Sequence, residues 1–310
     1  RIHMKKITVT LNGIEDPTCY LFSFAKSLMA VLKDSIFHEY YEDIIATSGF
    51  AFRMWVSENL CPSATSIWTF QNQKKWVENG GLLCEYVERL WDQESIELER
   101  RQEAISLIKK SIDNGIAVIS WDISNCEWGI ITGYCDSNET LSTLKINGEV
   151  SSLQYEKLGK IEIPILSVLS IVGKTDKSRE DINKGMFKLA VSHLKGEEWS
   201  SNNKKGLDVY SFLIDFVNTK YSSEVSWNLE YFLGTYASLK LYALKYFKKY
   251  EFNALAEIYD VVFNEWLNAF KLLKTSDISI DRLKGKIVEY LDKAYDAEKK
   301  ALEIMFQLSK

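Results

Sequence analysis

The feature that most constrains the fold is a change of pattern near Thr175. After Pro164 the chain contains no further proline, and apolar residues then recur at helical spacing to the terminus. The part before this point mixes strand and helix patterns. We therefore predict an α+β domain over residues 4–175, followed by an all-helical domain over residues 176–310. The predicted helices of the second domain cover residues 178–195, 204–221, 228–248, 251–274 and 279–308.

Strand patterns dominate the first domain. The segment "KKITVTLNG" alternates apolar and polar residues and predicts a strand, as do "GFAFRMWVS" and, later, "IAVISWDI", "EWGIITGYCDS" and "TLSTLKING". The segment "KIEIPILSVLSIVGK" predicts one or two more strands. A short helix is expected in "EYYEDIIATSG", and residues 69–114 carry two helical patterns.

Composition excludes several classes of function. The formal net charge is −5, with 38 basic and 43 acidic residues interspersed, so no basic surface is expected for nucleic acid or anionic lipid. No apolar stretch reaches the roughly 18 residues of a membrane helix. The five cysteines are odd in number and lack C-x-x-C spacing, which indicates reduced thiols in a cytoplasmic protein. No metal or cofactor motif is present, and no cofactor is expected.

The stretch "EDPTCYLFSFAKSLMAVL" places a cysteine at a predicted helix start. Asp16 is suited to the N-cap, Pro17 to the first helical position, and Cys19 would then be the third helical residue. Unpaired N–H groups and the positive end of the helix dipole favour a thiolate there. Cysteine is also a small hydrophobic residue that fills cores, and this alternative is equally open from the pattern alone.

A second stretch, "NCEWGIITGYCDSNETLSTLKING", resembles the paired strands of papain-like enzymes of the bacteriocin-processing type. Those strands carry a His-aromatic-x-x-(Ile/Val)-x-Gly-Tyr pattern, followed after a turn by a strand ending in Asp or Asn. The matching residues here are Trp128, Ile131, Gly133 and Tyr134, with Asn147 at the place of the third catalytic residue. The position of the histidine holds Glu127.

Together with "KKGLDVYSFLIDFV" and "EYFLGTYASLKLYALKYF", these motifs look like the family of butirosin-biosynthesis protein H, and the likeness spans nearly the whole chain. The resemblance implies a papain-like domain followed by a helical domain. It also implies acyl transfer from a thioester, on an acyl carrier protein or coenzyme A, through cysteine to a small-molecule amine in specialised metabolism. A homo-oligomer is compatible with the sequence.

The resemblance assigns a role to each candidate residue. Cys19 would be the nucleophile, Glu127 the base and Asn147 its orienting partner, while Asn12 would contact an oxyanion beside the Cys19 amide. For Asn12 and Asn147 a turn role is the alternative. The candidates for substrate binding are Asp16, Phe52, Trp55, Trp121 and Trp128; Asp16 can instead be a cap, and aromatic strand residues are more often core.

The absence of histidine at position 127 leaves three outcomes open. Glu127 serves as the base with a pKa raised by burial, His38 reaches the site from another loop, or covalent chemistry is lost and a binding pocket is kept. The leading function is a cysteine-dependent acyltransferase, amide synthase or thioester hydrolase. A catalytically silent binding protein on the same scaffold comes second, and a peptidase third.

Overall fold

The computed structural model describes residues 4–198 and 202–310 and divides the chain into two compact units. The first unit contains residues up to Ile14, Ser23–Ile44 and Thr69–Lys177, and the second contains Glu15–Phe22, Ile45–Trp68 and Ser178 onward. The division near Lys177 lies two residues beyond the predicted one. The second unit differs from the prediction because it also takes in two N-terminal segments, one of which carries Cys19.

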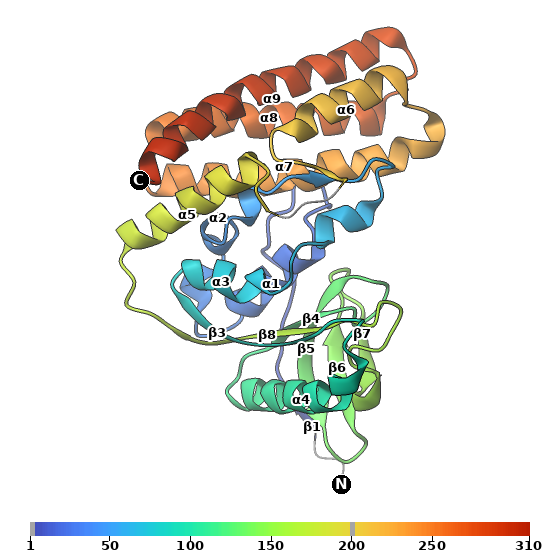
Figure 1. Ribbon diagram of the computed structural model, residues 1–310, viewed down its shortest axis with the longest axis vertical. Helices are drawn as coiled ribbons and strands as arrows, with labels where there is room; N and C mark the ends of the chain where they lie inside the picture. The colour runs from blue at the N-terminus through green and yellow to red at the C-terminus, as the bar shows by residue number, and fades with distance from the viewer. Residues whose placement is uncertain (1–3, 199–201) are drawn as a thin grey trace. The chain divides into compact units, whose positions relative to one another are not determined.

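The first unit is built on an antiparallel sheet with strand order β3-β8-β4-β5-β6-β7, and β1 pairs with β5 (Figure 1). Register is set on the central pair by Val118 opposite Ile131 and Trp121 opposite Trp128. The strands are β1 (Met4–Lys6), β3 (Leu82–Arg89), β4 (Val118–Trp121), β5 (Trp128–Cys135), β6 (Thr140–Leu144), β7 (Val150–Gln154) and β8 (Leu166–Lys174).

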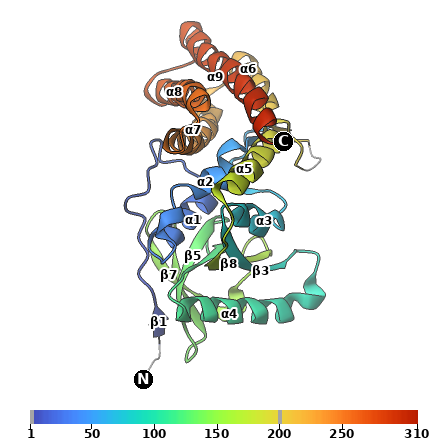
Figure 2. The ribbon, with the colours of Figure 1, turned by 90° about the vertical axis from the view of Figure 1, so that its left-hand side faces the viewer.

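Helices cover both faces of this sheet. Figure 2 shows α4 (Glu97–Asp113) on one face, and α1 (Ser23–Lys33) and α3 (Asn72–Asn79) on the other. α4 buries an apolar stripe at positions 104, 107, 108 and 112 against strand residues that include Val118, Ile131 and Val168. On the opposite face Phe24 of α1 lies edge-on to Trp128, with ring centroids 5.0 Å apart.

The second unit is mainly helical. α7, α8 and α9 run side by side as long helices in Figure 1. The elements are α2 (Ile44–Thr47), at which the chain enters this unit, β2 (Trp55–Val56), α5 (Arg179–Leu194), β9 (Lys204–Lys205), α6 (Asp208–Thr219), α7 (Ser226–Lys249), α8 (Asn253–Thr275) and α9 (Asp281–Leu308).

An ion pair lies in the interior of these helices. Lys240 of α7 places Nζ 2.7 and 2.9 Å from the two carboxylate oxygens of Glu298 on α9, and both side chains are 0% exposed. Tyr210 and Tyr259 each donate a hydrogen bond to Glu298, at 2.7 and 2.8 Å. Trp266 donates in turn to the Tyr210 hydroxyl. The buried carboxylate is therefore paired and fully hydrogen-bonded, as a charge in such a place must be.

Several predicted elements of the N-terminal half differ in the structure. The helix expected from Asp16 begins only at Ser23, because Cys19 has φ 65°, which ends any helical path through it. The expected strand at 49–57 is a short 3₁₀ turn (Phe50–Phe52) followed by the two-residue β2. The strand expected over residues 5–13 is limited to Met4–Lys6. Residues 69–114 hold β3 between two helices, and β7 was also missed.

Candidate active site around Cys19

Cys19 closes a tight turn whose backbone is strained. Its N–H donates to the carbonyl of Asp16 at 3.3 Å, and its φ of 65° places it in the left-handed region. A residue with a Cβ occupies that region only where its surroundings hold it there. The side chain of Cys19 is exposed. The thiol is therefore presented to solvent at the tip of a fixed turn.

Polar residues of α7 hold the first half of this turn. Thr18 Oγ1 donates to the carbonyl of Gly234 at 2.7 Å and lies 2.7 Å from Ser238 Oγ. The Ser238 hydroxyl also contacts Asp16 Oδ1 at 2.9 Å. Thr18 and Ser238 are both buried. Satisfied buried polar contacts of this kind fix position, because breaking one leaves its partner unpaired.

The residues after Cys19 are held by the same helix. Thr235 Oγ1 donates to the carbonyl of Tyr20 at 2.9 Å, and the Tyr20 hydroxyl donates to Glu230. A Cβ added at Gly234 would come within 2.6 Å of the Tyr20 ring, so glycine is what allows this approach. The sequence carries one signal of this close approach that the sequence analysis did not use. Gly234 and Ser238 are small residues four apart, so they lie on one face of a long helix.

Negative side chains flank the turn. Glu15 forms an ion pair with Lys245 at 2.7 Å, and its carbonyl accepts from Tyr242. Asp16 accepts from the N–H of Leu21 at 3.1 Å, so it stabilises the turn itself. Burial and, after it, the Glu230 carboxylate raise the pKa of Tyr20 well above its ordinary value. Tyr20 is therefore a neutral hydrogen-bond donor at physiological pH.

The helix-dipole argument for Cys19 is wrong, because α1 begins at Ser23 and Cys19 precedes it. Asp16 likewise caps no helix. The role of Asp16 is to join the turn to α7 and to the Leu21 amide. In the structure the Cys19 thiol is exposed on a turn that hydrogen bonds from α7 hold on both sides.

The other catalytic candidates belong to the first unit, whereas Cys19 belongs to the second. Asn12 is exposed in a turn after the first strand. Asn147 is exposed, and its side-chain oxygen accepts from the N–H of Glu149 at 2.9 Å. That contact is a local Asx turn between β6 and β7, which is the structural alternative foreseen for this residue.

Glu127 lies directly before β5 and is half-buried. Its backbone carbonyl accepts from the N–H of Asp122, in a loop where Asp122, Asn125 and Cys126 all have positive φ. Burial raises the pKa of the Glu127 carboxyl, and the nearby Lys145 partly opposes this. A carboxyl group shifted in this direction holds its proton nearer to neutral pH, as proton transfer requires.

The aromatic candidates lie in the interior of their own units. Trp121 and Trp128 are 3% and 1% exposed, and their ring centroids lie 5.2 Å apart, with Phe70 against both. Phe52 and Trp55 are 0% and 1% exposed. Tyr236 of α7 contacts both the N–H and the carbonyl of Trp55. These contacts agree with the core alternative rather than with a ligand-lining role.

Two histidines, His38 and His193, differ in environment. His38 lies in a 3₁₀ turn of the first unit, and its Nδ1 lies 2.8 Å from the carbonyl of Lys33. His193 is buried in α5, and burial lowers its pKa to about 3, with a further contribution from Arg53. Because it remains neutral and enclosed, His193 is unsuited to proton exchange with a substrate.

No family model matches this chain, and no curated protein matches it in a sequence search. Within residues 4–198 and 202–310, no group of three or more His, Cys, Asp or Glu side chains is arranged to hold a metal ion. Among the helices of that same part, none combines the length and apolarity needed to cross a bilayer.

Exposure predicts the order in which the cysteines react. Cys84 and Cys135 are buried, and Cys126 donates to Glu162 at 3.0 Å. Burial, followed by Glu162, raises the pKa of Cys126 to about 12. We expect iodoacetamide to modify Cys19 about tenfold faster than Cys126, Cys84 or Cys135, since thiolate fraction and access set the rate. Peptide mapping after brief alkylation measures this; equal labelling of Cys19 and Cys126 would contradict it.

Proposed function

We propose that the protein is a cysteine-dependent acyltransferase or amide synthase, with thioester hydrolysis as the variant in which water is the acceptor. The observation that carries the proposal is the exposed Cys19 thiol, held at φ 65° in a turn bonded to α7 on both sides. Residues held in sparsely populated backbone regions cluster at functional sites, and Cys19 combines such a backbone with an exposed thiol. The resemblance to the butirosin-biosynthesis H family supports the same chemistry.

The reaction would have two steps. A base takes the proton of the Cys19 thiol, and the thiolate attacks the carbonyl carbon of a thioester. The bond between that carbon and the donor sulfur breaks, and the donor sulfur receives the proton and leaves as a thiol, giving acyl-Cys19. An amine then attacks that carbonyl, the amide leaves, and the proton of the amine returns to the sulfur. With water as the acceptor, a carboxylic acid leaves instead. An acyl carrier protein or coenzyme A thioester is the proposed donor, and a small metabolite amine is the proposed acceptor.

Glu127 is proposed as a proton-transfer group on the chemistry of its own carboxyl, within the first unit. A carboxyl group whose pKa is raised by burial can exchange a proton closer to neutral pH than an ordinary glutamate. The papain-like assignment of the first unit is part of the same proposal. It is supported by the strand pair around Trp128 to Leu144, which is antiparallel and joined by a short turn.

The direct test is the mass of the intact protein after incubation with acyl thioesters. We expect wild-type protein to gain one acyl group from acetyl-coenzyme A or a longer acyl-coenzyme A, and Cys19→Ala to gain none. Cys61→Ala is the matched control, because Cys61 lies in the same unit and is partly exposed. That variant should be acylated like the wild type.

The outcome against the proposal is equally clear. If Cys19→Ala is acylated to the same extent as wild type, the nucleophile is elsewhere.

A graded test uses Gly234→Ala, in which the added methyl group meets the Tyr20 ring and displaces the turn. Acylation of that variant should slow while Cys61 reactivity stays unchanged, because only the Cys19 turn is moved.

The alternative function is a catalytically silent binding protein. It is favoured by the structural roles of the supporting candidates: the side chain of Asn147 closes a turn, and the aromatic candidates fill cores. That alternative predicts ordinary reactivity of Cys19, no acyl-enzyme, and ligand affinity that survives Cys19→Ala. Activity that appears only in Glu127→His would also favour it.

A further inference from the structure

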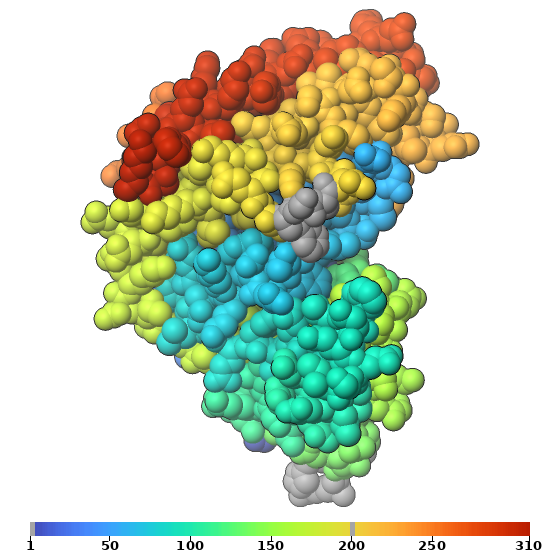
Figure 3. Space-filling view, viewed as in Figure 1, coloured from blue at the N-terminus to red at the C-terminus, as the bar shows by residue number. Residues whose placement is uncertain are grey.

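The edge of the sheet in the first unit carries a long strand with an open side. β3 stands first in the strand order and pairs with β8 alone among the described strands. It is eight residues long. Exposed edges of this length invite pairing with another strand unless the protein blocks them. The helix α4 packs against β3 and β8 beside this edge. Its outer surface faces the viewer in Figure 3 (teal).

Two side chains mark which backbone groups of β3 face outward. The N–H of Cys84 donates to the carboxylate of Glu78 at 3.0 Å, and the carbonyl of Glu88 accepts from Arg100 at 3.0 Å. Residues of an antiparallel strand alternate between pointing at one neighbour and at the other. Tyr86, midway between these two positions, therefore directs its own N–H and carbonyl to the open side.

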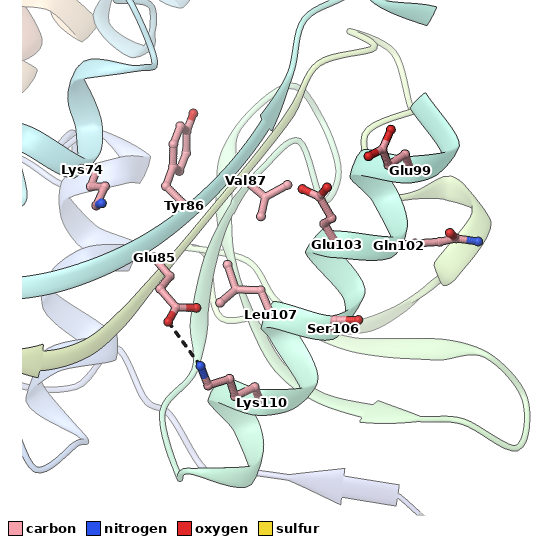
Figure 4. A pocket seen from close by; sticks show the side chains of 10 residues that line it. All are labelled: Lys74, Glu85, Tyr86, Val87, Glu99, Gln102, Glu103, Ser106, Leu107 and Lys110. Carbon is pink, nitrogen blue, oxygen red and sulfur yellow. Dashed lines mark hydrogen bonds and ion pairs between the residues drawn. The ribbon is translucent and has the colours of Figure 1, made fainter. Parts of the chain in front are cut away.

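A groove of about 710 Å³ runs along this edge (Figure 4). Its walls are β3, with Val87 in the floor, and one flank of α4. At one end Lys110 lies 3.2 Å from Glu85, as the dashed line shows. At the other end α4 presents Glu99 and Glu103. Lys110 is thus the basic residue of one end, paired there with Glu85, and Glu99 and Glu103 are the acidic residues of the other, where Glu103 lies 4.0 Å from Arg100.

The middle of β3 lies opposite the middle of the α4 segment that lines the groove. Glu85 is beside Lys110 and Glu88 is beside Arg100, so β3 and α4 run in opposite directions, and Tyr86 falls near the level of Leu107. Along the axis of α4, the point halfway between Glu103 and Lys110 therefore lies opposite Tyr86 as well. A two-fold axis at Tyr86 would therefore place Lys110 of one copy beside Glu103 of the other, twice.

The same two-fold axis would also pair the backbone groups of the two β3 strands and bring the exposed apolar residues of one end beside those of the other end. It pairs Tyr86 with itself and pairs the Cys84 N–H with the Glu88 carbonyl of the other copy, which are the two groups now capped by side chains. Exposed apolar residues also lie toward both ends of this edge. Leu83, Val172 and Ile36 are 43%, 42% and 84% exposed toward one end, and Trp91 and Leu98 are 66% and 56% exposed toward the other.

We propose that the β3 edge and the adjoining flank of α4 form an isologous interface with a second copy of this chain, the two β3 strands pairing antiparallel about Tyr86. Such an interface needs a surface complementary to itself, and the charge order of this groove meets that requirement. The Glu78 and Arg100 contacts protect the edge in the monomer and are exchanged for ladder hydrogen bonds in the dimer. This inference is independent of the proposed function.

Sedimentation velocity over a wide concentration range tests the interface. Wild-type protein should associate to a dimer. Lys110→Glu and Glu103→Lys should each weaken the dimer about tenfold or more, because each places two like-charge contacts across the axis. An equimolar mixture of these two variants should dimerise again, since every contact then joins opposite charges. The double variant should also dimerise.

Lys300→Glu is the matched control, because it makes the same charge change at an exposed position on α9 of the other unit. It should leave association unchanged. Hydrogen exchange gives a second readout: the Tyr86 amide should become protected as concentration rises. A wild-type protein that is monomeric throughout would overturn the proposal, as would a dimer that the single variants leave intact. Failure of the mixture to dimerise would overturn it as well.

Discussion

Glu298→Leu is expected to destabilise the helical unit by about 3–5 kcal/mol, because it leaves the buried Lys240 ammonium without its partner. Both side chains of this pair are 0% exposed, and the Tyr210 and Tyr259 hydroxyls lose their acceptor as well. Burial lowers the pKa of Lys240, while the Glu298 carboxylate opposes that shift. Removing the carboxylate therefore removes the interaction that stabilises the charged form of Lys240 in the interior.

Urea unfolding followed by far-ultraviolet circular dichroism measures this effect. Lys240→Met combined with Glu298→Leu should recover much of the loss, since replacing both charges by apolar groups removes the desolvation cost. Glu289→Leu is the control on the same helix, because Glu289 pairs with Lys286 and Lys293 at the surface. Little change is expected there. If Glu298→Leu unfolds at the wild-type midpoint, the buried pair contributes nothing to stability.

The second large effect is a dependence of stability on pH through His193. Burial lowers its pKa to about 3 in the folded protein, against an ordinary value of 6.5. Between these two values the unfolded chain binds a proton that the folded chain does not, so stability falls as pH drops from about 6.5 toward 3. The loss from this residue is on the order of 5 kcal/mol across that window. It is constant below the folded pKa.

The measurement compares wild type with His193→Gln at several pH values. Glutamine cannot titrate, so the variant should lose less stability than wild type as pH falls, even if it is weaker at pH 7. Arg53 and Glu198 lie close to His193 and form their own ion pair at 2.8 Å, which both proteins retain. Parallel stability curves for the two proteins would show that His193 is not held neutral by the fold.

The sequence predicted the helical second half closely. α5 through α9 each lie within a few residues of the predicted segments, because an amphipathic stripe repeated over many turns can be buried in only one way. The strands β4, β5, β6 and β8 were also found, since alternation and strong β-formers agree there. The strands β3 and β7 were missed, because their exposed or half-buried faces give weak alternation. The strands predicted over residues 5–13 and 49–57 and the start of the first helix were wrong in extent.

The candidate site was predicted only in part. The choice of Cys19 rested on a helix that does not start there, and a turn with positive φ has no signature when the residue is not glycine or asparagine. The partners of that turn, Gly234 and Ser238, are more than two hundred residues away. Local propensity cannot report contacts at such separation.

Amino-acid order alone thus determined the helical half and the central strands. Tertiary structure decided that residues 15–22 join the helical unit, that Cys19 is a strained and exposed turn residue, and that an edge strand lies beside α4. The physical reason is that the spacing of apolar residues along a short segment is enough to indicate whether that segment is a helix or a strand. Which polar groups meet, and which backbone is strained to let them meet, depends on segments that only the folded chain brings together.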